Sequence, residues 1–186
     1  MISTAERPLR VAAIGDFARE VEAESGANLA ACLQCAKCTS GCAVASRADI
    51  KPHEMVRLVQ FGARDEALSS RMIWECTSCE TCATRCPQGV SVAAMIDALR
   101  RLSRAAGKTS AQTDAPAFND IFLGTVKQAG RVYEVGLMAA FKLRTRSLTR
   151  DLSKVPVMLL KRKLALLPSF VKGRGERRRL FRRAGR

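Results

Sequence analysis

Hydrophobic residues recur at helical spacing along most of the chain, and no stretch alternates convincingly between polar and apolar positions. Two stripes are predicted to be buried core: Met55, Val56 and Val59, and Met95, Ile96 and Leu99. Ser91 is a good N-cap for the helix that carries the second stripe, and Gly107 follows its end. The predicted helices of the first half cover residues 17–24, 52–61, 64–68 and 92–105.

The C-terminal part of the chain has a different pattern. Two further helices are predicted, over 116–128 and 132–143. Residues 153–167 alternate apolar patches with a basic run, and beyond Pro168 the chain is rich in Gly and Arg, so we expect a flexible tail there.

Charge separates the two parts more sharply. The 186 residues carry a formal net charge of +15. Residues 1–141 are nearly neutral, whereas residues 142–186 hold 16 Lys and Arg against only Asp151 and Glu176, a net of +14. The basicity therefore belongs to the C-terminal segment alone.

All eight cysteines fall into two copies of one motif, C-x2-C-x2-C-x3-C. The first copy consists of Cys32, Cys35, Cys38 and Cys42, and the second of Cys76, Cys79, Cys82 and Cys86. Three cysteines at intervals of three turn their thiolates toward one object, which suits three iron corners of a [4Fe-4S] cubane. The fourth leads away from its neighbours, and in two-cluster proteins it ligates the other cluster.

The spacing therefore predicts two [4Fe-4S] clusters with crossed ligation. The first is expected on Cys32, Cys35, Cys38 and Cys86, and the second on Cys42, Cys76, Cys79 and Cys82. Zinc is the nearest competitor, but its sites usually draw on two separate C-x2-C pairs without a third cysteine. A disulfide framework would require a secreted chain, which nothing in the sequence indicates.

The fold class expected is all-α, because the spacer between the motifs has helical rather than strand-like periodicity. We predict an α-helical two-cluster ferredoxin domain over 1–107, a helical extension over 108–168 and the basic tail over 169–186. No apolar run approaches the ~20 residues of a membrane span, and no secretory or transit signal is recognisable, so a cytoplasmic location is expected.

Four residues near the motifs allow a structural and a functional interpretation. Trp74 is expected to be core, although it could shield a cluster. His53, the only histidine, is expected at the surface rather than as a ligand. Lys37 and Arg85 are expected to be solvated, although their charges could tune a cluster's potential.

The basic tail leaves three kinds of partner open. Docking on a partner subunit is favoured over contact with the inner face of an anionic membrane. Nucleic acid is disfavoured, because only Phe170 and Phe181 could stack on bases and no recognition fold is visible.

The chain resembles the C subunit of heterodisulfide reductase (HdrC). The resemblance rests on the helix before the first motif, Ile73-Trp74 leading into Cys76, the exit Cys86-Pro87-Gln88-Gly89-Val90, and Gly130-Arg131-Val132-Tyr133-Glu134. Ala43 departs from it, because many relatives have proline after the first motif. Iron–sulfur subunits of the succinate-dehydrogenase type also carry this repeated motif in an all-helical domain.

The resemblance implies a small helical ferredoxin that passes electrons between the flavin-bearing A subunit of such a complex and its B subunit, which carries CCG-type catalytic domains. The Ala- and Arg-rich composition favours the bacterial sulfur-oxidising version of the complex. The sequence has no CCG motif, nucleotide-binding G-x-G-x-x-G or nucleophile–base pair of its own, which favours an electron carrier without a catalytic site. The alternatives are an iron–sulfur subunit of a glycolate-oxidase or succinate-dehydrogenase-like enzyme, or a cluster-bearing regulatory or nucleic-acid-associated protein.

Overall fold

The computed structural model describes residues 15–108, 114–146, 158, 160–161 and 169–184. Within these ranges every regular element is a helix and no strand occurs, which confirms the all-α prediction. The chain divides into two compact units, Met1–Thr113 and Asp114–Arg186, and each is considered by itself.

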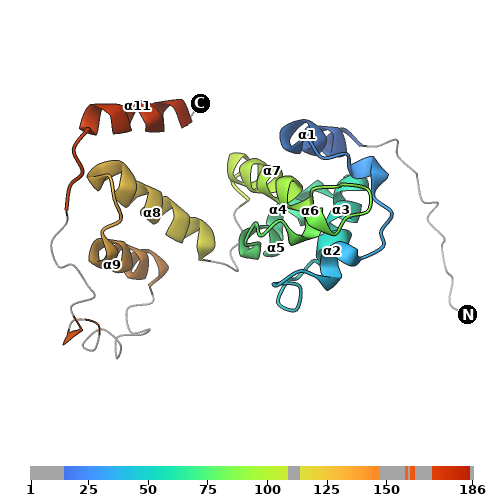
Figure 1. Ribbon diagram of the computed structural model, residues 1–186, viewed down its shortest axis with the longest axis horizontal. Coiled ribbons are helices and arrows are strands. Elements are labelled where there is room, and N and C mark those ends of the chain that lie inside the picture. The colour runs from blue at the N-terminus through green and yellow to red at the C-terminus, as the bar shows by residue number, and fades with distance from the viewer. Residues whose placement is uncertain (1–14, 109–113, 147–157, 159, 162–168, 185–186) are drawn as a thin grey trace, which may run out of the picture. The chain divides into compact units, whose positions relative to one another are not determined.

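The first unit is built around its longest helix, α7 (Val92–Ala105), which packs against α1, α4, α5 and α6 (Figure 1). Two very short helices, α2 and α6, lie inside the cysteine motifs and contact each other. The other elements of this unit are α1 (Asp16–Ser25), the 3-10 turn η1 (Leu29–Ala31), α2 (Lys37–Ser40), α3 (Pro52–Gln60), α4 (Arg64–Ser69), α5 (Met72–Glu75) and α6 (Thr81–Thr84).

The bounds of α7 are those predicted from its sequence. Ser91 Oγ accepts a hydrogen bond of 3.2 Å from the backbone N–H of Ala94, so one of the free donors of the first turn is satisfied. At the other end the chain turns at Gly107, whose φ of +64° favours glycine.

The two predicted core stripes are buried completely, with 0% exposure for all six side chains. Burying an aliphatic side chain of this size contributes about 1.5–3 kcal/mol relative to leaving it in water. Trp74 is also buried, with 8% exposure, so the prediction that it is a core residue is confirmed.

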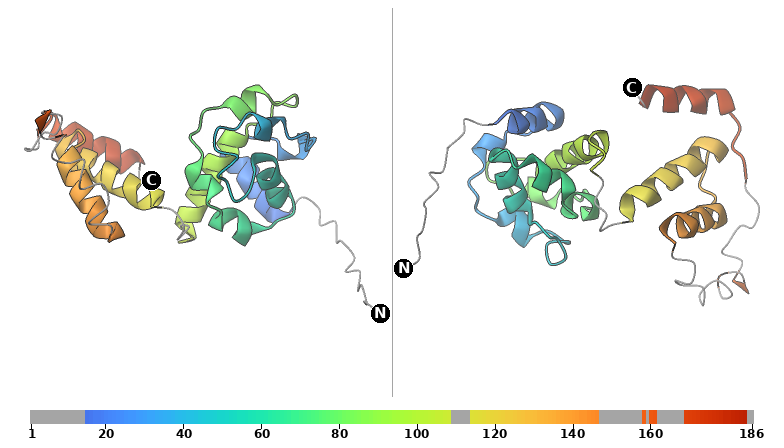
Figure 2. Two further views of the ribbon diagram at one scale, coloured as in Figure 1. Left: turned by 90° about the horizontal axis from the view of Figure 1, so that it is seen from below. Right: turned by 180° about the vertical axis from the view of Figure 1, so that it is seen from behind.

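The second unit contains an antiparallel pair of helices, α8 (Ala115–Ala129) and α9 (Glu134–Thr145), joined through Gly130 in the left-handed conformation. The Phe118 ring meets the Phe141 ring edge to face, with 5.6 Å between their centroids. A third helix, α11 (Arg174–Ala184), lies along the other side of α8 (Figure 2).

Helix α11 differs from the flexible tail expected beyond Pro168. The Arg177 guanidinium donates hydrogen bonds to the carbonyl oxygens of Lys127, at 3.0 Å, and Gln128, at 2.9 Å, and the Val171 N–H donates to the carbonyl of Ala129. These carbonyls end α8 and have no partner within it, so the basic segment satisfies them. Arginine is also a good helix former, so an Arg-rich segment can form a helix once it has a surface to pack against. The predicted apolar and basic stretch over 153–167 lies almost wholly outside the described residues.

Candidate metal centre

Two neighbouring hollows in the first unit divide the eight cysteines between them. The first hollow, with about 370 Å³ of space, is lined by Cys32, Cys35, Cys38 and Cys86. The second hollow, with about 400 Å³, is lined by Cys42, Cys76, Cys79 and Cys82. Part of each space is open to solvent. Each hollow therefore gathers three cysteines of one motif and the last cysteine of the other.

The two cysteine loops have the same backbone conformation, 44 residues apart. Gln34 and Ser78 have φ values of 54° and 50°, and Ala36 and Glu80 both have 58°. None of these is glycine, although a left-handed residue with a side chain costs roughly 1–2 kcal/mol. The repeated strain turns the loop around its middle cysteine, and Cys35 and Cys79 are the two exposed cysteines of the chain.

A few side chains hold the two loops together. The Arg85 side chain packs on Gly41, where an added Cβ would lie only 2.8 Å from Arg85 Cδ, Nε and Nη1. A larger residue immediately before Cys42 would therefore displace the Arg85 side chain from this position. Val92, the first residue of α7 and only 3% exposed, lines both hollows and forms a common wall between them.

The cysteine environments differ within the centre. Burial raises the pKa of Cys38, Cys76 and Cys82 above that of an ordinary thiol. Hydrogen bonding to Thr81, whose Oγ1 lies 3.4 Å from Cys79 Sγ, lowers the pKa of the exposed Cys79. Buried thiols need a bound cation to hold them as thiolates, which is the condition of metal ligands.

His53, expected at the surface rather than as a ligand, is only partly exposed. It is half-buried at the start of α3 and lines the first hollow. Its Nδ1 lies 2.7 Å from Thr39 Oγ1, and Thr39 Oγ1 also accepts a hydrogen bond from the His53 backbone N–H. The pair ties α3 to α2, whereas the cysteines supply the candidate ligands.

Arg100 is a positioning residue that sequence reasoning missed. It extends from α7 and donates hydrogen bonds to the carbonyl oxygens of Ile73 and Cys76 and, at 3.2 Å, to Ser78 Oγ. An ion pair with Asp97, at 2.8 Å, fixes its guanidinium. Arg100 thereby joins the end of α5 to the left-handed turn of the second cysteine loop.

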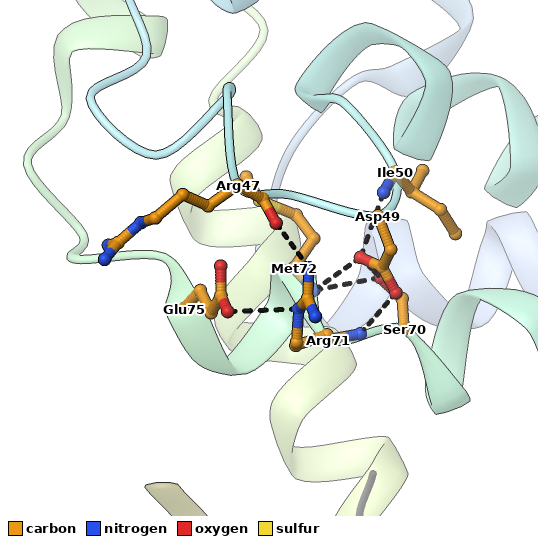
Figure 3. A network of polar contacts seen from close by, with 7 residues as sticks. All are labelled: Arg47, Asp49, Ile50, Ser70, Arg71, Met72 and Glu75. Carbon is orange, nitrogen blue, oxygen red and sulfur yellow. Dashed lines mark hydrogen bonds and ion pairs between the residues drawn. The ribbon is translucent and has the colours of Figure 1, made fainter. Parts of the chain in front are cut away.

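Asp49 holds the other end of α5, as Figure 3 shows. Its carboxylate accepts hydrogen bonds from the backbone N–H groups of Arg71, at 2.7 Å, and Met72, at 2.9 Å, and from Ser70 Oγ, at 2.9 Å. Burial alone would raise the pKa of Asp49, but these hydrogen bonds outweigh it and lower the pKa below the usual range. The exit from the first motif thus fixes the entry to the second.

The geometry fits two clusters of several metal atoms. None of the eight cysteines forms a disulfide bond, and all eight line the two hollows. Four thiols around a hollow of this kind are the donor set of a [4Fe-4S] cubane.

The part of the chain that forms this centre matches a known family model. Residues 31–91 match the model of the 4Fe-4S dicluster domain.

About half of the chain is similar to HdrC, the C subunit of heterodisulfide reductases. The C subunit of the H(2):CoB-CoM heterodisulfide,ferredoxin reductase of Methanothermobacter thermautotrophicus is 30% identical over 92 residues, which are 50% of this chain and 50% of that protein. The iron-sulfur C subunit of the CoB--CoM heterodisulfide reductase of Methanopyrus kandleri is 36% identical over 86 residues, 46% of this chain and 45% of the relative. The iron-sulfur C 2 subunit of the enzyme from Methanocaldococcus jannaschii is 36% identical over 80 residues, which are 43% of this chain and 42% of that protein. The chain spans about half the length of the curated relatives it matches.

Two [4Fe-4S] clusters are therefore the cofactors of the dicluster domain, as predicted from the cysteine spacing. No helix within the described ranges has both the length and the apolarity to cross a membrane.

Proposed function

We propose that this chain is an electron-transfer subunit whose two [4Fe-4S] clusters are held by crossed ligation. The first cluster would be held by Cys32, Cys35, Cys38 and Cys86, and the second by Cys42, Cys76, Cys79 and Cys82. The observation that carries the proposal is the pair of hollows, each lined by one of these sets of four.

The polypeptide supplies position and insulation. A [4Fe-4S] cluster takes up and releases one electron at a time. Val92 lines both hollows, so the two centres are neighbours with one aliphatic side chain as their shared wall. Cys35 and Cys79 are exposed, which gives each centre a face toward solvent where a redox partner can approach. These features suit a relay with an entry and an exit.

The partners proposed are those implied by the family. The chain would pass electrons between the flavin-bearing A subunit and the CCG-domain B subunit of a heterodisulfide-reductase-like complex in the cytoplasm. The names of the relatives support a subunit role, and the composition favours the bacterial sulfur-oxidising form of the complex.

We assign the contact with a partner subunit to the basic helix α11. Arg177 is engaged with the end of α8, but Arg178, Arg179 and Arg182 are exposed and available to an acidic surface. Replacing these three arginines by glutamine should leave about eight irons per chain and weaken binding to the other subunits. Undiminished binding to those subunits would refute this assignment, and a loss confined to anionic vesicles would point to a membrane instead.

The proposal is tested by anaerobic purification of the full chain. Iron and sulfide analysis should give about eight of each per chain, and reduction should produce the EPR signals of two interacting [4Fe-4S] clusters. Flavin- and CCG-containing subunits should co-purify. Zinc in place of iron would refute the electron-transfer function. Co-purification with a glycolate-oxidase or succinate-dehydrogenase-like enzyme, or retention on one DNA sequence, would refute the assigned complex.

Crossed ligation has its own test. Cys42→Ser should alter the EPR signal assigned to the trio Cys76, Cys79 and Cys82, although Cys42 belongs to the other motif. Cys86→Ser is the matched variant and should alter the other signal. If each substitution disturbed the cluster of its own motif, the crossed assignment would be wrong.

A further inference from the structure

The two cysteine loops have the same backbone conformation but carry different charged side chains. With the 44-residue offset, Lys37 of the first loop stands where the second loop has Thr81, and Glu80 of the second stands where the first has Ala36. Lys37 lines the first hollow and Glu80 lines the second. At matched positions the two sites therefore differ by two full charges.

Hydrogen-bond donors reach ligand sulfurs in both hollows, so they do not separate the two sites. In the second hollow Thr81 Oγ1 lies 3.4 Å from Cys79 Sγ and the Ala93 N–H interacts with Cys82, and the first hollow has donors of its own. Gln34 Nε2 lies 3.4 Å from Cys32 Sγ, and the Val90 backbone N–H donates to Cys86 Sγ at 3.3 Å. His53 also lines this hollow. Positive charge and donors directed at ligand sulfurs stabilise the more negative, reduced form of a cluster, which raises its potential.

The second hollow differs from the first in its charge. Glu80 brings a negative charge, and the nearby Arg100 is neutralised by its ion pair with Asp97. Met72 and Ile96, which line this hollow, are 1% and 0% exposed. The negative charge disfavours an added electron. Buried apolar walls are common to both hollows, because Val90 and Val92 of the first are 1% and 3% exposed.

Two further charged features bear on the difference in potential between the two sites. The N-terminus of α7 is directed at the second hollow, where the Ala93 N–H interacts with Cys82, but a helix terminus is equivalent to roughly half a charge. Arg85 precedes Cys86 and packs on Gly41 beside Cys42, so it favours neither site. Lys37 and Glu80 are both exposed, so solvent screens part of their effect. The difference of two full charges still exceeds the half charge of one helix terminus and decides the order.

We infer that the cluster of the first hollow has a higher reduction potential than the cluster of the second. Lys37 raises the potential of the first cluster, and Glu80 lowers that of the second. The inference rests on the proposed function, because it requires both clusters. An electron that a low-potential donor gives to the second cluster would then pass to the first. In that transfer the second cluster is oxidised by one electron and the first is reduced by one electron. Lys37 and Glu80 act on the clusters through space and are not ligands.

The experiment is an anaerobic redox titration of the full, cluster-loaded chain, followed by EPR, with dithionite as reductant. Cys35→Ser and Cys79→Ser chains assign each signal to a hollow. Lys37→Gln should lower the midpoint potential of the first-hollow signal, and Glu80→Gln should raise that of the second-hollow signal. Each substitution should therefore reduce the difference between the two midpoint potentials. Glu66→Gln is the control, because this exposed α4 carboxylate lines neither hollow, and both midpoints should stay in place.

A higher midpoint for the second hollow in the parent chain would overturn the inference, as would midpoints that respond to Glu66→Gln as much as to Glu80→Gln. Iron and sulfide analysis of the same samples separates this outcome from failure of the proposed function. Chains with about eight irons and two signals in the wrong order refute the ordering alone, whereas chains without two clusters refute the electron-transfer proposal.

Discussion

Ala36 and Glu80, 44 residues apart, have the same left-handed backbone with a φ of 58°. Each follows the exposed middle cysteine of its loop and begins a helical turn of four residues. Neither residue type adopts this conformation readily, so the chain strains its backbone in the same way at both sites. This strain leads directly to a prediction.

Ala36→Gly should stabilise the protein. Glycine adopts positive φ without the Cβ penalty, and the gain of roughly 1–2 kcal/mol exceeds its extra entropy in the unfolded chain, about 0.4–1 kcal/mol. The melting temperature of the cluster-loaded chain, followed by circular dichroism under argon, should rise by a few degrees. Ala94→Gly, in the ordinary helix α7, is the control and should lower it. Equal decreases in both variants would contradict the strain argument.

Arg100 and Arg101 are adjacent on α7 and should behave differently. Arg100→Leu removes the donors that serve two backbone carbonyls and one partner of Asp97, which should cost about 1.5–3 kcal/mol and speed the loss of iron to a chelator. Arg101→Gln breaks an ion pair with Glu24 that is about half exposed, and should cost less than about 1 kcal/mol. Chelator kinetics, followed in the visible absorption of the clusters, and melting temperature measure both effects. Similar losses in the two variants would show that Arg100 does not position the loop.

Asp49→Asn should remove a pH-dependent stabilisation. The hydrogen bonds from Ser70, Arg71 and Met72 lower the pKa of Asp49 in the folded protein. Its contribution is therefore complete above the unfolded pKa of roughly 3.9 and is lost as the pH falls through the folded value. The difference in melting temperature between parent and variant should be constant at neutral and mildly acidic pH and shrink below about pH 4. A difference that grew toward low pH would have the wrong sign.

Removal of iron should unfold much of the first unit. The cysteines connect α2, α6 and the start of α7, and most of the remaining helices there have ten residues or fewer, too short to persist alone. Chelation under argon should abolish a cooperative melt and reduce the helical signal. A metal-free chain with an undiminished signal and a sharp transition would contradict this. The parent chain reloaded with iron and sulfide is the control and should recover both.

Much of the fold could be predicted because its signals are local. The ends of α7 follow from Ser91 and Gly107, and the buried stripes of α3 and α7 follow from helical spacing. The short turns α2 and α6 could not be predicted, because four residues carry no periodicity. Helix α11 was missed because its partner is the exposed end of α8, about 50 residues earlier.

The candidate site divides in the same way. The cysteine motifs identify the thiols, since ligand spacing is a local property of the sequence. The roles of Arg100 and Asp49 depend on carbonyl and amide groups more than 20 residues away. The partial burial of His53 could not be predicted for a similar reason, because Thr39, 14 residues earlier, holds the ring against the first hollow. Lys37 and Arg85 are exposed, as expected from the sequence. Lys37 also lines the first hollow, and its role as a charge that tunes the cluster potential stays a prediction.

Each cysteine loop ends by placing its last thiol among the three of the other loop. The tandem motifs therefore do not amount to two separable modules. A chain cut between residues 43 and 75 would yield two fragments, each with three thiols for one site and a fourth that belongs elsewhere. Loss of one motif would therefore remove a ligand from both clusters. We expect the two clusters and the domain around them to assemble as one unit.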